Sequence, residues 1–252
     1  MAFIFAQGLL LGVLPIDTRL AIIITQVVII LGGALVYRHY FGRKQTKWPR
    51  VRRLGMSPMA LIVVLIASVS LGFLANALGA LTILVFPNLA PMAVEYQEQI
   101  QQLLLPEALH AQILGAVAIA VVAPICEEVM FRGTLLPEQR RSQTAANAIL
   151  LNGLLFSAMH LNPVALLSLF VVGAYFAHIT LRSGSLWGAI LGHAVLNLVN
   201  GVVLLRVAAD MADPQEVGWL EVGLALAILI PVTALLWWGS LRLIGSGDEE
   251  RG

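Results

Sequence analysis

Two adjacent carboxylates stand at the end of a long apolar run in this sequence. Glu127 and Glu128 follow the segment Ile113–Cys126, which consists of small and aliphatic residues. An ionisable side chain in a membrane-spanning helix costs at least about 2.5–3.5 kcal/mol on insertion scales. Two such side chains next to each other therefore indicate a chemical or structural requirement.

An arginine lies at the right spacing to pair with one of these acids. Arg132 follows Glu128 by four residues, and an acid N-terminal to a base is the favourable order along one face of a helix. Glu127 lies about 100° round the helix from Glu128, so we expect Glu128 to pair with Arg132 and Glu127 to be free for chemistry. Pro124 removes a backbone donor just before the acids and permits a bend with room for water. The alternative is that both acids are solvated at an ordinary cytoplasmic helix end.

Two further pairs of residues interrupt later apolar segments at helical spacing. Phe156 and His160 are four residues apart, as are His193 and Asn197, so each pair shares one face of a helix. His178 has no comparable partner, and a lone histidine of this kind is usually a hydrogen-bonded packing residue. Because polar groups in hydrocarbon must find partners, we expect the paired residues and the glutamates to converge on one polar cavity.

These residue types suit the hydrolysis of an acyl bond. A carboxylate such as Glu127 can take a proton from water while a neutral imidazole orients that water. His193 and Asn197 can donate hydrogen bonds to the oxygen of a tetrahedral intermediate. The alternative is a zinc ion held by Glu127, His160 and His193, although the His-Glu-x-x-His spacing of metalloprotease helices is absent. No cofactor is certain, and zinc is the only one that these residues suggest.

Cys126 is the only cysteine in the sequence. A single cysteine excludes an internal disulfide and a cysteine zinc cluster. Its position beside Glu127 raises the alternative of a thiol nucleophile, but a small buried hydrophobic residue is the favoured interpretation.

The composition is that of an integral membrane protein. The 252 residues are 59% hydrophobic and 12% charged, and the mean hydropathy is +0.89, whereas soluble domains carry roughly 25% charged residues. We therefore expect an all-α fold, a polytopic membrane helix bundle with about seven to eight transmembrane helices. The lipid bilayer is one expected partner, and no basic patch with interleaved aromatic residues suggests nucleic acid.

The distribution of charge predicts the topology. Seven Lys and Arg residues and no acid lie between Arg38 and Arg53, so this loop is expected in the cytoplasm. The segment Pro87–His110 carries glutamates and no Lys or Arg, which fits the external face. The apolar segment from Ala2 to Leu14 has only 13 residues, so its length does not show whether it is a further membrane span, a re-entrant segment or an interfacial helix. The predicted spans are Leu20–Tyr37, Met59–Phe86, Ile113–Leu136, Ala145–Leu161, Pro163–Leu181, Leu186–Leu205 and Val217–Leu241.

The predicted topology sets the depth of the polar residues. Counted at about 1.5 Å per residue from the cytoplasmic helix ends, Glu127 lies roughly 14 Å deep and His193 about 10 Å, but His160 about 22 Å. His160 reaches the others only if its helix is tilted or starts above the membrane surface. We expect residues 1–110 to hold the N-terminal spans and the basic loop, residues 111–206 the catalytic core, and residues 207–252 the C-terminal span and an acidic tail.

Three motifs together resemble the signature of a known family. Glu127-Glu128-x-x-x-Arg132, Phe156-x-x-x-His160 and His193-x-x-x-Asn197, in this order and in an apolar setting, are similar to the motifs of the CAAX protease and bacteriocin-processing enzyme (CPBP) family of intramembrane proteases. The family includes the type II CAAX prenyl endopeptidases and the abortive-infection proteins. The resemblance covers roughly Val121–Gly201.

The resemblance implies a function for each motif residue. It assigns the activation of the attacking water to Glu127 and His160, the stabilisation of the oxyanion to His193 and Asn197, and the shape of the motif to Glu128 with Arg132. It leaves both a glutamate-dependent and a metallopeptidase mechanism open.

The resemblance also implies a place and a substrate class. The short loops are similar to those of the bacterial branch, so we expect an inner (plasma) membrane endopeptidase whose site opens to the cytoplasm and whose substrate is a membrane-delivered peptide or protein tail. The alternatives are a non-catalytic membrane scaffold or immunity protein of the same fold, and a small transporter or proton-coupled channel. The sequence does not fix the oligomeric state or a requirement for prenylation.

Overall fold

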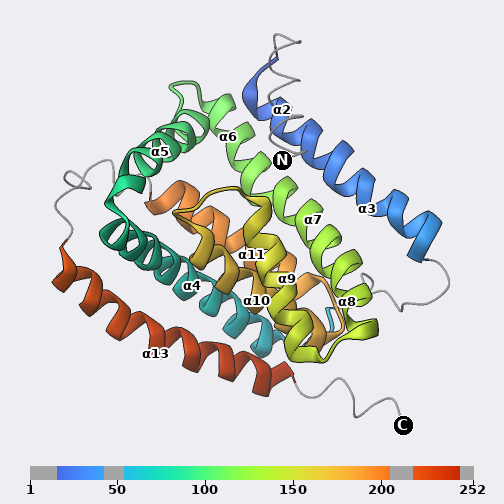
Figure 1. The fold of residues 1–252 in the computed structure, drawn as a ribbon. Coiled ribbons are helices and arrows are strands. Elements are labelled where there is room, and N and C mark those ends of the chain that lie inside the picture. The colour runs from blue at the N-terminus through green and yellow to red at the C-terminus, as the bar shows by residue number, and fades with distance from the viewer. Residues whose placement is uncertain (1–15, 43–53, 205–217, 245–252) are drawn as a thin grey trace.

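The computed structural model describes residues 16–42, 54–204 and 218–244, which form helices joined by short loops (Figure 1). Several segments discussed from the sequence lie outside these residues. They are residues 2–14, most of the basic loop, the acidic loop before the last helix and the C-terminal tail. The described elements are α2 (Thr18–Thr25), η1 (Gln26–Leu31), α3 (Gly32–Tyr37), η2 (Arg38–Gly42), α4 (Pro58–Val85), η3 (Pro87–Leu89), α5 (Ala90–Leu104), α6 (Leu109–Val117), η4 (Ala118–Val122), α7 (Ala123–Glu128), η5 (Val129–Leu135), α8 (Leu136–Ser142), α9 (Ala145–Met159), α10 (Leu166–Ser183), α11 (Trp187–Leu198), η6 (Val199–Leu204) and α13 (Trp219–Ile244).

The predicted fold class, an all-α polytopic membrane bundle, is confirmed. Among the described residues, five helices are long and apolar enough to cross a membrane, and α9 is a shorter apolar helix of 15 residues. The helix α11 continues through η6, close to the predicted span. The total of seven to eight crossings stays a prediction. The five long helices are Thr18–Phe41, Pro58–Val85, Leu109–Ser142, Leu166–Ser183 and Trp219–Ile244.

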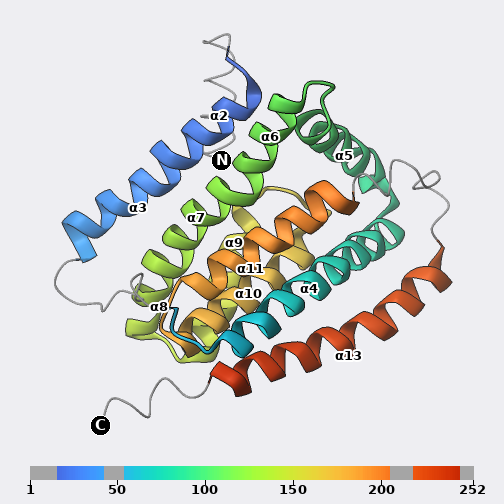
Figure 2. The same ribbon diagram turned by 180° about the vertical axis from the view of Figure 1, so that it is seen from behind.

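The helix α4 is the central support of the bundle. Ser57 caps its N-terminus by accepting a hydrogen bond from the Ala60 backbone, and Pro58 occupies the first turn, where a missing N–H costs nothing. Its 28 residues pack along α13 on one side and α11 on the other, an order that is visible from both sides of the molecule (Figures 1 and 2). Ser70 of α4 bonds Thr233 of α13 at 2.8 Å, so a polar contact supplements their apolar packing.

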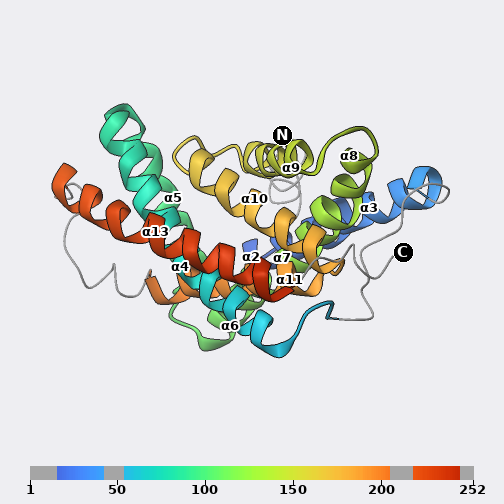
Figure 3. The same cartoon turned by 90° about the horizontal axis from the view of Figure 1, so that it is seen from below.

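Close contact between two glycines joins α9 to α10. A Cβ atom on Gly173 of α10 would lie 2.8 Å from the Cα of Gly153 in α9. Small residues let membrane helices approach at the backbone. The helix α9 lies on the side of the bundle opposite α6 (Figure 3). The helix α9 therefore holds its C-terminal end, which carries Phe156, firmly against α10.

The long helix Leu109–Ser142 is interrupted by two π-helical segments. The segment η4 precedes α7 and η5 follows it, and Pro124 lies in the first turn of α7. Proline removes one backbone donor, and a π-helical turn re-pairs the carbonyl groups that this leaves. The Glu-Glu motif thus sits on a short α-helical piece between two segments of altered geometry, an arrangement that is frequent at functional sites.

Candidate active site

His193 of α11 lies between the two glutamates of α7. Its Nδ1 atom is 2.8 Å from Glu128 Oε1, and its Nε2 atom is 4.0 Å from Glu127 Oε2. The imidazole is 3% exposed. Because an ionised carboxylate only accepts hydrogen bonds, Nδ1 carries the proton and donates a hydrogen bond to Glu128. The two acids, about 100° apart on their helix, therefore both face one histidine of a neighbouring helix.

The ion pair expected from the four-residue spacing is formed in the interior. Arg132 Nη1 donates to Glu128 Oε1 at 2.9 Å, and both side chains are fully buried. Arg132 Nη2 donates to the backbone carbonyl of Gly173 at 2.9 Å, and the guanidinium lies 4.6 Å from the centre of the Phe156 ring. The arginine thus neutralises one acid and links it to α10 and α9.

Phe156 is the apolar centre of the cluster. Its ring centroid lies 4.8 Å from that of His160 and 5.7 Å from that of His193. The Nδ1 atom of His160 is 2.8 Å from the Phe156 carbonyl oxygen, so Nδ1 is the donor and Nε2 presents its lone pair. Among the described residues, no hydrogen bond or ion pair joins His160 to Glu127. The structure brings the motifs together around Phe156 but does not place His160 against the acid.

The end of α9 explains the position of His160. The helix has 15 residues, which is about 22 Å, and His160 is its C-cap. Leu161 follows with φ 51°, a left-handed conformation that ends many helices and is rare for a branched residue. His160 thus reaches the Phe156 cluster from the C-terminal end of α9.

Asn197 ties α11 to the π-helical segment before the acids. Its Nδ2 atom donates to the carbonyl of Ile119 in η4 at 3.0 Å. One amide hydrogen is therefore used in holding two elements together, and no hydrogen bond of the second is found among the described residues. Gly192 lets α11 lie close to its neighbours, since a Cβ atom there would be 2.6 Å from Ser68 Oγ and 2.8 Å from the Phe176 ring.

Comparison with protein families identifies the segment that carries these residues. Residues 108–199 match the family model described as type II CAAX prenyl endopeptidase Rce1-like. This segment of the chain is Rce1-like. The recognition made from the three motifs is thereby confirmed. Searches of curated proteins and of solved structures found no significant match.

The Rce1-like segment begins just before α6 and ends just after α11. It contains all six residues predicted for the site. The first described span, α4, α5 and α13 lie outside it, so the match covers the motif-bearing helices and not the whole bundle. The six residues are Glu127, Glu128, Arg132, His160, His193 and Asn197.

One residue of the site lies outside the Rce1-like segment and was missed by sequence analysis. Gln26, at the start of η1, donates from Nε2 to Glu127 Oε1 at 2.8 Å, and only 4% of it is exposed. The segments before residue 111 were expected to add only spans. A polar residue inside the apolar run Leu20–Tyr37 was the signal available in the sequence.

Tyr96 of α5 also lies within the influence of the candidate site. Burial raises the pKa of the Tyr96 phenol, and the negative charge of Glu127 raises that pKa further, although 50% of the residue is accessible. The phenol is therefore protonated at neutral pH and can donate a hydrogen bond. Sequence analysis had assigned this segment to the external face only.

The zinc ligands considered from sequence do not form a ligand set in this arrangement. Among the described residues, no three His, Cys, Asp or Glu side chains gather around one point that could hold a metal ion. Of the three candidates, Glu127 and His193 face each other, but His160 is not joined to Glu127. We therefore derive no step through a metal, and a zinc requirement stays a prediction for a chelator experiment.

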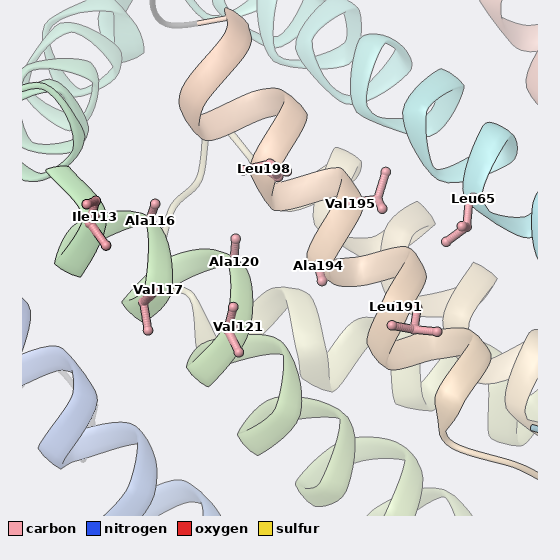
Figure 4. Close-up of a pocket in the computed structure, with 10 residues that line it drawn as sticks. All are labelled: Leu65, Ile113, Ala116, Val117, Ala120, Val121, Leu191, Ala194, Val195 and Leu198. Carbon is pink, nitrogen blue, oxygen red and sulfur yellow. The ribbon is translucent and has the colours of Figure 1, made fainter. Parts of the chain in front are cut away.

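An apolar groove runs beside the site (Figure 4). It has a volume of about 440 Å³ and lies between α6, η4 and α11, with Leu65 of α4 at its edge. Ala194 and Leu198 line it, and each directly follows a predicted site residue on α11. Ala120, next to Ile119, faces them. An apolar chain in the groove would therefore lie alongside the bond between Asn197 and η4.

His178 and Cys126, which were not assigned to the three motifs, are both found in packing contacts or in the core. The His178 ring packs against Trp237 with centroids 6.1 Å apart, away from the glutamates. Cys126 is 2% exposed, as expected for a small core residue.

Proposed function

We propose that this protein is an intramembrane endopeptidase that hydrolyses a peptide bond of a membrane-delivered peptide or protein tail. The observation that carries the proposal is the approach of Glu127 Oε2 to His193 Nε2 at 4.0 Å in a buried, Rce1-like cluster. This separation is too long for a direct hydrogen bond and suits two groups that share one water molecule.

In the proposed reaction, Glu127 is the general base. Its free oxygen Oε2 takes a proton from the shared water, and the resulting hydroxide adds to the carbonyl carbon of the scissile bond. Glu127 then returns this proton to the leaving nitrogen, and the hydroxyl proton of the collapsing intermediate follows through Glu127, so that the products are a carboxylate and an ammonium group. No other proton source is required.

Asn197 is proposed to stabilise the developing oxyanion, and His193 to orient the attacking water. The second amide hydrogen of Asn197 is the donor to the oxyanion. His193 Nε2 carries no proton while Nδ1 donates to Glu128, so it accepts a hydrogen bond from the water. The resemblance assigns the water to His160, but the distances favour His193 as the histidine nearest Glu127. His160, with Nε2 free, is then proposed to contact the substrate rather than Glu127.

Glu128 and Arg132 are proposed to position these groups. Glu128 Oε1 accepts from both His193 and Arg132, so it fixes the imidazole that faces Glu127. We propose that this buried ion pair contributes more to the fixed orientation of these side chains than to the net stability of the fold.

The substrate is proposed to arrive through the membrane. The groove beside Asn197 is lined by aliphatic side chains, which suits apolar residues or a lipid-modified tail. The charge bias of the loops further supports a site that opens to the cytoplasm, and the bacterial inner membrane is proposed as its location from the resemblance of the short loops to those of the bacterial branch. Reporter fusions at the Arg38–Arg53 loop would test this orientation, and an external location of that loop would contradict it.

The test is cleavage of a quenched fluorescent peptide library, with and without a lipid-modified C-terminus, by purified protein in lipid. We compare wild type, Glu127→Gln, and Glu138→Gln as a control at a carboxylate outside the cluster. We expect cleavage by wild type and by the control variant, and loss in Glu127→Gln. Equal cleavage by Glu127→Gln would overturn the proposal and favour the scaffold alternative.

A second arm of the same experiment addresses the metal. Wild type is assayed with and without a chelator that has been shown to reach the site in lipid. Activity that survives the chelator supports activation of water by Glu127 alone. Loss with the chelator and recovery with added zinc would instead assign a metal to the site.

A further inference from the structure

The first described span carries a polar side chain into the centre of the candidate active site. Gln26 is 4% exposed and donates from Nε2 to Glu127 Oε1 at 2.8 Å. It lies 101 residues before Glu127 in the sequence and outside the Rce1-like segment. This contact is therefore not one that the matched family segment supplies.

Hydrogen bonds at the start of the same span fix the position of Gln26 along the direction of the helix axis. The buried Arg19 donates from Nε to the carbonyl of Leu103 at 2.9 Å and from Nη2 to that of Gln102 at 2.6 Å. These carbonyls belong to the C-terminal turn of α5, where backbone acceptors lack helical partners and a cation is favourable. Gln26 follows Arg19 by seven residues, about 10.5 Å along the helix. The anchor therefore prevents the span from sliding past Glu127.

Packing along the span holds Gln26 against the motif helix. The segment η1, which begins at Gln26, packs against α7, while α2 packs against η4 and α3 against η5. Thr25, the preceding residue, bonds the carbonyl of Ala21 within its own helix. The span thus lies along the motif helix on the side that Figure 1 shows next to α6 and α7, with one polar side chain directed at an acid.

The contact divides the two oxygens of Glu127 between different tasks. Oε1 accepts from Gln26, and Oε2 is left facing His193 Nε2. A carboxylate held at one oxygen has lost its free rotation, so the other oxygen keeps one direction. The Oε1 atom of Gln26 itself is buried with no hydrogen-bond partner among the described residues. An unpaired buried acceptor is costly, and a donor on a bound molecule or water would satisfy it.

We propose that Gln26 is a positioning residue that holds Glu127 with Oε2 turned toward His193, so that the first described span is part of the catalytic unit. This inference rests on the proposed function, because it gives Glu127 the function of the base. It differs from a packing function in what it predicts for activity. A packing residue changes how much protein folds, whereas a positioning residue changes the rate of each folded molecule.

The experiment compares Gln26→Leu, Gln26→Glu and the matched control Thr25→Val, with wild type and Glu127→Gln in the same assay. Gln26→Leu keeps the volume and removes the donor. Gln26→Glu keeps the length and places a second carboxyl against Glu127. Thr25→Val removes a neighbouring buried polar group that makes no contact with the site. Thermal unfolding gives the folded fraction, and kcat and KM are expressed per folded protein.

We expect Gln26→Leu to lower kcat by about 10- to 100-fold with KM changed less than about twofold, because small displacements of a catalytic group cost up to about that much. In Gln26→Glu, two neighbouring carboxyls share a proton, so the acid limb of the kcat profile moves to higher pH. Thr25→Val keeps the wild-type rate and pH profile.

The outcomes separate this inference from the proposed function. Cleavage by wild type but not by Glu127→Gln, together with wild-type kcat and pH profile in both Gln26 variants, would overturn the inference alone. Unfolding of both Gln26 variants beside a folded Thr25→Val would also overturn it, because the residue would then be structural. Equal cleavage by wild type and Glu127→Gln would overturn both.

Discussion

His193 and Glu128 are joined inside the bundle by a 2.8 Å hydrogen bond from Nδ1 to Oε1. The same oxygen accepts from Arg132 at 2.9 Å, so one carboxylate oxygen connects α11, α7 and η5. The other oxygen, Oε2, is buried with no partner among the described residues. Both donors to Glu128 are consequently needed to compensate its charge.

Removal of Arg132 is expected to destabilise the protein strongly. Arg132→Met leaves a fully buried carboxylate without its cation, and breaking a buried pair from one side costs about 3–5 kcal/mol. Arg141→Met at the exposed pair with Glu138 should cost less than about 1 kcal/mol. Thermal unfolding of the purified variants measures both. Equal melting temperatures for the two variants would contradict the buried pair.

The three histidines of the later helices are expected to differ in their effect on catalysis. His193→Ala removes a contact to both glutamates and should lower kcat/KM by about 10²–10⁴-fold, the range of general acid–base groups. His160→Ala should lower it less, because the contacts of His160 among the described residues are with Phe156 and not with a glutamate. His178→Ala is the control, since that ring packs against Trp237 away from the acids.

The measurement is kcat/KM for the three variants on one cleaved peptide, corrected for the folded fraction. A larger loss in His160→Ala than in His193→Ala would reverse the assignment made from the distances. The activation of the water would then be assigned to His160, as the family resemblance implies.

Much of the fold followed from local features of the sequence. Apolar runs with charged ends predicted the helices, because a membrane span needs about 20 apolar residues. The four-residue spacing from Glu128 to Arg132 predicted their ion pair for the same local reason. The extent of α9 also followed, since the predicted Ala145–Leu161 is close to the observed Ala145–Met159, but the left-handed turn at Leu161 that ends this helix did not.

Contacts across the bundle were less predictable than spacing within a helix. The pairing of Gln26 with Glu127 joins residues 101 positions apart, and no periodicity links two segments at that distance. The use of one Asn197 hydrogen for the Ile119 carbonyl depends on the π-helical turn of η4, which the sequence indicated only as a bend near Pro124. Both contacts require the tertiary arrangement.

Asn197 is expected to act on both stability and rate. Asn197→Asp keeps the size but removes the donor to Ile119 and the second amide hydrogen. Loss of one oxyanion donor lowers kcat by about 10²–10³-fold, and loss of the bond to η4 costs about 1 kcal/mol. Asn76→Asp, at a partly exposed amide pair with Asn200, is the control. If Asn197→Asp lost stability but kept kcat, Asn197 would be structural only.

The glycine contact between α9 and α10 is expected to fix the position of the Gly173 carbonyl that accepts from Arg132. Gly173→Ala would place a Cβ 2.8 Å from the Cα of Gly153 and 3.1 Å from the Cβ of Phe156. The helices must then separate, which costs about 1–3 kcal/mol and moves the Gly173 carbonyl away from Arg132. Because Arg132 also lies over the Phe156 ring, activity per folded protein should fall as well. Gly79→Ala, with no atom within 4 Å of the new Cβ, is the control for thermal unfolding and cleavage. A Gly173→Ala protein as stable and active as the control would show that Arg132 does not depend on this backbone contact.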